Sequence, residues 1–139
     1  MPRNIEISTE VGKDGMGSLS ASQYCWEFNY LDCERVIPIH PYDIRNFDLV
    51  RYDVRPNRLM KVSAALFPLN FPNPVRIEAY IYDSNRNLNL FQAKEIDSTT
   101  NTFEFNAPTE PGLYTFLFKA IYQWDIGGIS YHPVQMYVN

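Results

Sequence analysis

The sequence predicts an all-β protein built as a sandwich of two antiparallel sheets, and two observations support this. Runs of about four to ten residues rich in Val, Ile, Phe and Tyr recur along the chain, each followed by Pro, Gly or Asn. Within these runs apolar and polar residues alternate, which is typical of strands buried on one face only. Because two half-buried sheets must cover each other, we expect a sandwich.

Turn residues set the bounds of the predicted strands. Pro fixes φ, and Gly or Asn accept positive φ, so that RPN at 55–57 and PTEPG at 108–112 separate consecutive runs. The predicted strands cover residues 5–11, 35–39, 50–54, 59–67, 75–82, 88–95, 102–106, 113–124 and 129–138.

Three segments depart from this pattern. Residues 12–17 are rich in Gly and predict a loop. The cysteine segment 23–33 predicts a hairpin that folds around Asn29 and Tyr30. The span 41–48 breaks the alternation and predicts one short helical turn.

Alternation also assigns the faces of the strands. In 113–124 we expect Thr115, Lys119 and Gln123 to face water. Similarly, 75–82 has a wet face of Arg76, Glu78, Tyr80 and Tyr82. The residues expected in the core are Tyr114, Phe116, Phe118, Ala120, Tyr122 and Trp124, together with Val75, Ile77, Ala79 and Ile81.

Length and charge exclude several classes of protein. The 139 residues suffice for one domain over 1–139. The net charge is -4 and the 12 Lys and Arg are scattered, which disfavours a nucleic-acid partner. No segment is apolar for long enough to cross a membrane. The N-terminus carries no apolar signal region, so the chain is either cytosolic or a segment of a longer precursor.

Cys25 and Cys33 are eight positions apart, and the predicted hairpin would bring them opposite each other. In an oxidising compartment this favours a structural disulfide. A metal site would need two further ligands, for which the soft donors are His40 and His132, and a redox pair lacks the Cys-x-x-Cys spacing. In the cytosol the two thiols would be free. We therefore expect no bound metal and no cofactor.

Catalytic chemistry finds little support in the residues. His40 and His132 each precede a Pro at the end or edge of a predicted strand, where we expect them to serve turns. The carboxylates Asp43, Asp48 and Asp53 lack the spacing of a calcium loop. We expect no catalytic residues and a protein that is not an enzyme.

Four tyrosines on the predicted solvent faces are the candidate ligand-binding residues: Tyr80, Tyr82, Tyr131 and Tyr137. Their rings could hold sugars by stacking, or form a protein interface, which is enriched in Tyr. Alternatively, Tyr is a favoured strand residue that packs well against its cross-strand neighbours.

The segment 108–116 resembles the turn and strand opening found late in many bacterial immunoglobulin-like domains. The resemblance implies an immunoglobulin-like sandwich in which the Tyr114 hydroxyl ties the corner between the sheets. Phe116 stands where an antibody domain carries its second cysteine, so the antibody-type disulfide is not expected.

Residues 17–54 resemble a group of Gram-positive cell-surface lipoproteins, which begin with Gly-Ser-Tyr-Cys-Trp and carry a second cysteine shortly after. Here Gly17-Ser18, Tyr24-Cys25-Trp26 and Cys33 match, although 19–23 is inserted. The resemblance implies a protein outside the membrane, whose anchor is not in this chain.

Together these observations predict a non-enzymatic extracytoplasmic module, binding or structural, that recognises a partner through loops and an aromatic sheet face. The expected partner is a protein or a cell-wall polysaccharide, no nucleic acid is expected, and a membrane would be reached only through the anchor. One alternative is a carbohydrate or cell-wall binding domain. Another is a proteinase inhibitor whose loop, stiffened by three Pro in 67–74, would present Leu69, Asn70, Phe71 and Asn73.

Overall fold

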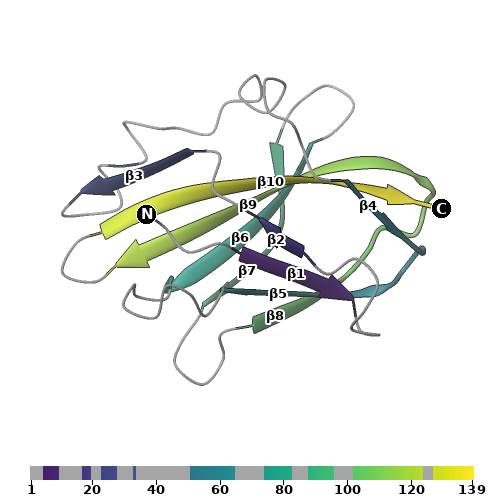
Figure 1. Cartoon of the computed structure of the whole chain (residues 1–139), viewed down its shortest axis with the longest axis horizontal. Coiled ribbons are helices and arrows are strands. Elements are labelled where there is room, and N and C mark those ends of the chain that lie inside the picture. Colours follow the sequence, from purple (N-terminus) through teal and green to yellow (C-terminus); the bar gives the residue numbers. More distant parts are fainter. Residues whose placement is uncertain are drawn as a thin grey trace.

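The computed structural model describes residues 5–9, 17–19, 23–27, 33, 51–64, 74–82, 88–95, 102–123 and 127–139. In this part the chain forms ten strands in two sheets (Figure 1), which confirms the predicted all-β sandwich. No helix in it is long and apolar enough to cross a membrane. Several predictions lie outside the described residues: the strand 35–39, the hairpin turn at Asn29 and Tyr30, the helical turn 41–48, His40, Trp124 and the loop residues Leu69, Asn70, Phe71 and Asn73.

The smaller sheet has four strands in the order β2-β1-β5-β8, all antiparallel. The strands are β1 (Ile5–Thr9), β2 (Gly17–Leu19), β5 (Leu59–Ala64) and β8 (Thr102–Asn106). The sequence missed β2, because its three residues directly follow the glycine-rich segment and are too few to show alternation.

The larger sheet has six strands, five of them in the order β3-β10-β9-β6-β7. They are β3 (Gln23–Glu27), β10 (Gly127–Val138), β9 (Gly112–Gln123), β6 (Arg76–Tyr82) and β7 (Leu88–Glu95). The sixth strand, β4 (Arg51–Val54), pairs with β10 in parallel. The prediction of antiparallel sheets is therefore wrong for this one pairing, because β4 runs in the same direction as β10.

β3 and β4 share one edge of β10 and lie at its opposite ends (Figure 1). β3 pairs with 127–131 and β4 with 135–138. Pro133 falls between the two stretches and is paired only with Leu117 of β9 on the other side. Since Pro has no backbone N–H to donate, it is tolerated where no described strand follows on that edge.

The inner faces of the two sheets meet in one apolar core. The ring of Phe105 on β8 lies 5.8 Å from that of Phe116 and 6.2 Å from that of Phe118 on β9, so these rings join the sheets. The prediction that 116–122 buries every second residue in the core is confirmed. The core consists of Ile7, Val54, Met60, Val62, Ile77, Ala79, Phe105, Ala107, Phe116, Phe118, Ala120, Tyr122, Val134, Met136 and Val138.

The edge strand β7 contains a β-bulge in its pairing with β6. Ala79 pairs with Gln92 and Tyr80 with Leu90, which leaves Phe91 as the extra residue of the strand. The Phe91 ring meets Phe105 edge-on at 5.6 Å and Phe116 at 5.8 Å. The bulge thus places the Phe91 ring between the edge strands β7 and β8 of the two sheets. Beside it, Gln92 Nε2 on β7 donates a hydrogen bond to the Glu104 carbonyl on β8 at 2.8 Å.

The corner before β9 has the geometry that the sequence predicted. The Tyr114 hydroxyl donates a hydrogen bond to the Glu110 carbonyl at 2.7 Å. Gly112 between them has φ of +154°, which favours Gly over other residues. In the RPN turn, Asn57 has φ of +59°, and Arg58 N donates to the Arg55 carbonyl at 3.3 Å.

We expect Tyr114→Phe to lower the free energy of unfolding by about 1 kcal/mol, because it removes this hydrogen bond and keeps the ring. Urea denaturation followed by circular dichroism would measure the change. Tyr137→Phe, which deletes a hydroxyl from the outer face, is the matched control and should alter stability little. Equal effects of the two substitutions would contradict a role of the corner in stability.

Candidate functional site

The face of the six-stranded sheet that points away from the core has two halves with different surroundings. Leu117, Ile129 and Tyr131 point to this outer face, since their neighbours along β9 and β10 alternate into the core. Nevertheless, each of the three is at most 4% exposed. They form a second apolar cluster with Cys25 and Cys33, and we call this half of the face the covered half.

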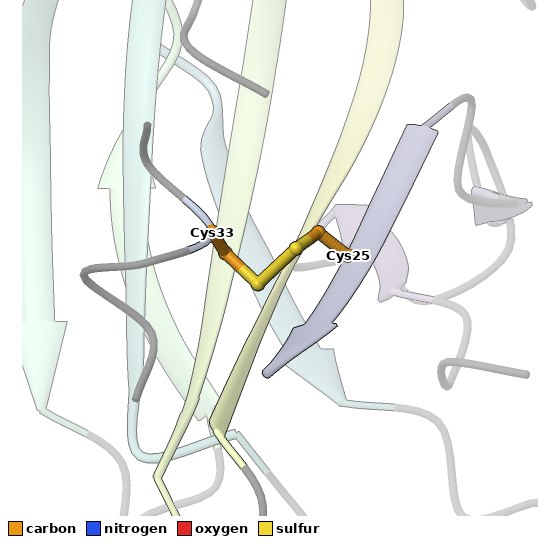
Figure 2. The surroundings of a disulfide bond; sticks show 2 residues. All are labelled: Cys25 and Cys33. Carbon is orange, nitrogen blue, oxygen red and sulfur yellow. A yellow bond between two sulfur atoms is a disulfide. The ribbon is translucent and has the colours of Figure 1, made fainter. Parts of the chain in front are cut away.

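The disulfide between Cys25 and Cys33 holds this covered half, as predicted. Cys25 lies on β3 opposite Ile129 of β10, and the Cα atoms of the two cysteines are 5.6 Å apart. Cys33 is fully buried as a member of this cluster. Figure 2 shows the disulfide running from Cys25 on β3 to Cys33. The bond therefore joins an edge strand to a residue packed on the outside of the sheet.

The predicted row of four solvent-facing tyrosines is not present as one surface. Tyr131 is buried, contrary to prediction, because the disulfide cluster covers the outer face at that position. Tyr80 and Tyr82 pack against the same cluster and are half-buried. Tyr137 is six residues from Tyr131 along β10, or about 20 Å away, and lies on the other half of the face.

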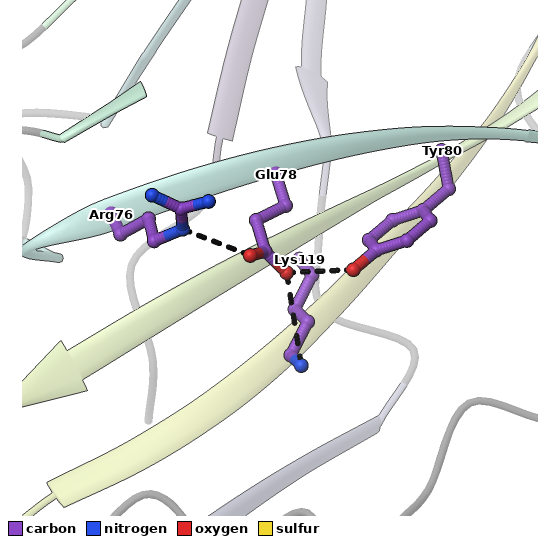
Figure 3. A network of polar contacts seen from close by, with 4 residues as sticks. All are labelled: Arg76, Glu78, Tyr80 and Lys119. Carbon is purple, nitrogen blue, oxygen red and sulfur yellow. Dashed lines mark hydrogen bonds and ion pairs between the residues drawn. The ribbon is translucent and has the colours of Figure 1, made fainter. Parts of the chain in front are cut away.

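A polar network lies beside the cluster, with Glu78 at its centre (Figure 3). Arg76 Nε donates to Glu78 Oε2 at 2.8 Å, and the Tyr80 hydroxyl donates to Oε1 at 2.7 Å. Lys119 is directly opposite on β9, with its Nζ 3.8 Å from Oε1. The Lys119 side chain is only 7% exposed, which corrects the prediction that it faces water.

Opposing effects act on the pKa of Glu78. Burial raises the pKa of the carboxyl, but hydrogen bonds from Arg76 and Tyr80 and the charges of Lys119 and Arg76 lower it, and the net shift is downward. Glu78 is therefore ionised in the folded protein at neutral pH, and the network stabilises its charge.

His132 lies within β10 and is fully buried, so the expectation that it serves a turn is wrong. Its Nε2 is 2.8 Å from the hydroxyl oxygen of Ser130, which is also fully buried on the inner face. The strand continues through the His-Pro pair because, among the described strands, none pairs with Pro133 on the edge that β3 and β4 share.

The other half of the outer face is more exposed and lies where β4, β10 and β9 run side by side. The pairing arranges its residues in two rows, Arg51–Gln135–Thr115 and Asp53–Tyr137–Leu113. All six are at least partly exposed, and Leu113 is 54% exposed. We call these six residues the open platform.

Direct contacts hold the platform's charged and aromatic groups together. The Arg51 guanidinium carbon lies 4.7 Å from the centroid of the Tyr137 ring, a cation–π distance. The same guanidinium is 3.4 Å from Asp53 Oδ1. Leu113, the neighbour of Tyr137 across the strands, adds exposed apolar surface beside the ring. The platform thus combines an apolar surface, formed by Tyr137 and Leu113, with a hydrogen-bond donor, Arg51, and an acceptor, Asp53.

Sequence reasoning named Tyr137 but missed the rest of the platform. Alternation in 51–54 signals that Arg51 and Asp53 share a face, yet only the parallel pairing with β10 places them beside Tyr137. Within the described ranges, no three His, Cys, Asp or Glu residues gather in a way that could hold a metal ion.

Comparisons with known proteins give one similar structure. No protein-family model and no curated protein matches the sequence. Among solved structures, the extended catalytic domain of LPMO9A from H. jecorina, also called EG4, is similar, with 14% identity and a TM-score of 0.43 over 100% of this chain and 73% of the other. It contradicts the expectation that the chain is not an enzyme, because the matched domain is catalytic, and we withdraw that expectation. At this identity and TM-score the likeness assigns no function and no catalytic residue to this chain.

Replacing both cysteines, as Cys25→Ala with Cys33→Ala, should lower the free energy of unfolding by about 2 to 3 kcal/mol in the chain-entropy model, because a short loop is no longer closed in the unfolded state. Urea denaturation would measure the loss. The reduced wild-type protein is the control and should lose a similar amount. A double variant as stable as the oxidised protein would show that the bond does not stabilise the fold.

Glu78 should make stability depend on acid pH. Its pKa is lowered in the folded state, so the stabilisation is fully present above the unfolded value of about 4.5 and is lost as the pH falls through the folded value. We expect the difference in free energy of unfolding between wild type and Glu78→Gln to be largest at pH 7 and to shrink below about pH 4.5. Urea denaturation from pH 7 to pH 3 measures this difference. Asp53→Asn, which removes an exposed carboxylate, is the control, and a difference for Glu78→Gln that is constant with pH would contradict the assignment.

Proposed function

We propose that the protein is an extracytoplasmic carbohydrate-binding module that holds a sugar chain on the open platform. The observation that carries the proposal is the row of Tyr137 and Leu113 with Arg51 and Asp53 beside it. A sugar ring has an apolar face of C–H groups and a rim of hydroxyls. The apolar face suits the Tyr137 ring and Leu113, and the hydroxyls suit the guanidinium and the carboxylate.

The size of the platform favours a sugar over a protein partner. Three strands and two rows span about 10 Å by 7 Å between backbone positions. A stable protein interface buries about 800 Å² on each partner, several times what six residues on such an area offer. A ligand of one or a few sugar units, in contrast, contacts only a small area, on which a few convergent polar groups fix its orientation.

The geometry of the platform is also suited to binding because its side chains are held in advance. All six residues lie on paired strands rather than on loops, and Arg51 is held by both Tyr137 and Asp53. Groups ordered before binding lose less conformational entropy when a ligand arrives. A flat ligand such as a polysaccharide chain would therefore meet a surface that is already shaped.

The compartment supports the same proposal. Disulfides persist in oxidising environments, and the bond between Cys25 and Cys33 closes a short loop of the covered half. The resemblance of 17–54 to Gram-positive cell-surface lipoproteins points to the outside of the membrane, where cell-wall polysaccharides are abundant. The inhibitor alternative draws on residues outside the described part and gains no support from the platform.

Tyr137→Ala and Leu113→Ala should each weaken binding to a polysaccharide by about tenfold, or 1.4 kcal/mol, because each removes apolar surface that would contact the sugar. Retention on insoluble cellulose and chitin, and on purified Gram-positive cell walls, would measure the effect. Leu90→Ala is the matched control, since Leu90 is an equally exposed leucine, 57% exposed, on the distant edge strand β7. Equal retention of all variants, or no retention of the wild type, would refute the proposal.

A further inference from the structure

We infer that the open platform selects uncharged sugars and that Asp53 is the residue that excludes anionic ones. This inference rests on the proposed function, and it adds the chemical class of the ligand and the residue that determines it. It is drawn from the arrangement of the two charges on the platform and from the charge of the whole chain.

The two charges of the platform cancel at close range. Arg51 and Asp53 are the only charged residues among its six, and their side chains approach to 3.4 Å. An anion that touched the Arg51 guanidinium would also lie within a few ångströms of the Asp53 carboxylate. The attraction of the one charge is then largely offset by the repulsion of the other. The platform thus lacks the unopposed cations by which proteins hold carboxylates or phosphates.

The carboxylate is also the more accessible of the two charges. The Asp53 side chain is 68% exposed and that of Arg51 is 53% exposed. Arg51 is further occupied, because its guanidinium lies over the Tyr137 ring. A ligand approaching from solvent therefore meets a negative group that accepts hydrogen bonds more readily than a positive group that donates them.

A neutral sugar satisfies this arrangement without an opposing charge. One hydroxyl can donate to Asp53 while its neighbour accepts from Arg51, and hydrogen bonds to ionised groups are about twice as strong as those between neutral groups. The Gln135 amide and the Thr115 hydroxyl in the adjacent row supply further donors and acceptors. Uncharged polysaccharides offer such neighbouring hydroxyls repeatedly along the chain.

The charge of the whole protein acts in the same direction. The net charge of -4 repels a polyanion during approach, over a screening length of about 10 Å at 0.1 M salt. Binding of a neutral polysaccharide, in contrast, should change little with salt. The salt dependence of binding is therefore a second readout that does not require any substitution.

The experiment compares wild type, Asp53→Asn, Asp53→Lys and Glu104→Lys by affinity electrophoresis. The probes are two uncharged polymers, hydroxyethyl cellulose and glycol chitin, and one anionic polymer, polygalacturonate. Glu104→Lys is the matched control, because it makes the same charge change at an exposed residue of β8 on the other sheet. Circular dichroism confirms that each variant is folded, which the exposure of both positions favours.

We expect wild type to bind an uncharged probe with little salt dependence and polygalacturonate at least about tenfold more weakly. Asp53→Lys should gain about tenfold or more for polygalacturonate at low salt, Asp53→Asn should gain less, and Glu104→Lys should not match either. An equal gain for Glu104→Lys, or a preference of wild type for polygalacturonate, would overturn the inference alone. If wild type and Tyr137→Ala were both unretarded by every probe, the proposed function itself would fail.

Discussion

The antiparallel ladder between β9 and β10 is the constraint on which the rest of the structure depends. All twelve residues of β9 pair with all twelve of β10 in one unbroken register. Because side chains alternate across a strand, this register decides at once which residues enter the core and which lie outside. The core rings of Phe116 and Phe118, the buried Tyr131 and the half-buried Tyr137 all follow from it. Of the remaining strands of the larger sheet, β3 and β4 pair with β10, β6 pairs with β9, and β7 pairs with β6.

Two strands share one edge of β10, and this divides the outer face. β3 brings Cys25 and, through the disulfide, Cys33 over one half, so that ordinary outer-face residues become a second core. β4 extends the sheet at the other end and leaves its outward side chains in solvent. The same face therefore carries a buried cluster at one end and partly or fully exposed side chains at the other.

The two halves also differ in the environment of their charged side chains. In the covered half, Glu78 and Lys119 are largely removed from water, and such groups are tolerated only when they are paired and hydrogen-bonded. Arg76 and Tyr80 complete that pairing. On the open platform, the Arg51 and Asp53 side chains remain in water, so their ion pair contributes little to stability and both groups stay accessible to a ligand. The buried network therefore serves the fold, whereas the exposed pair is suited to recognition.

The sequence by itself determined the all-β class, most strand positions, the inward residues of β9, the corner at Tyr114 and the pairing of Cys25 with Cys33. The corner at Tyr114 was implied by the resemblance of 108–116 to immunoglobulin-like domains. The others follow from local alternation, turn chemistry and short spacing, which the chain encodes within a few neighbouring residues. Only the tertiary structure decided that Tyr131 and Lys119 are buried, that His132 lies inside a strand, and that Arg51 and Asp53 join Tyr137. Alternation separates two faces of a strand but does not say whether the outer one is covered. Likewise, the parallel pairing of β4 with β10 joins segments about eighty residues apart, and no local pattern specifies which edge a strand will meet.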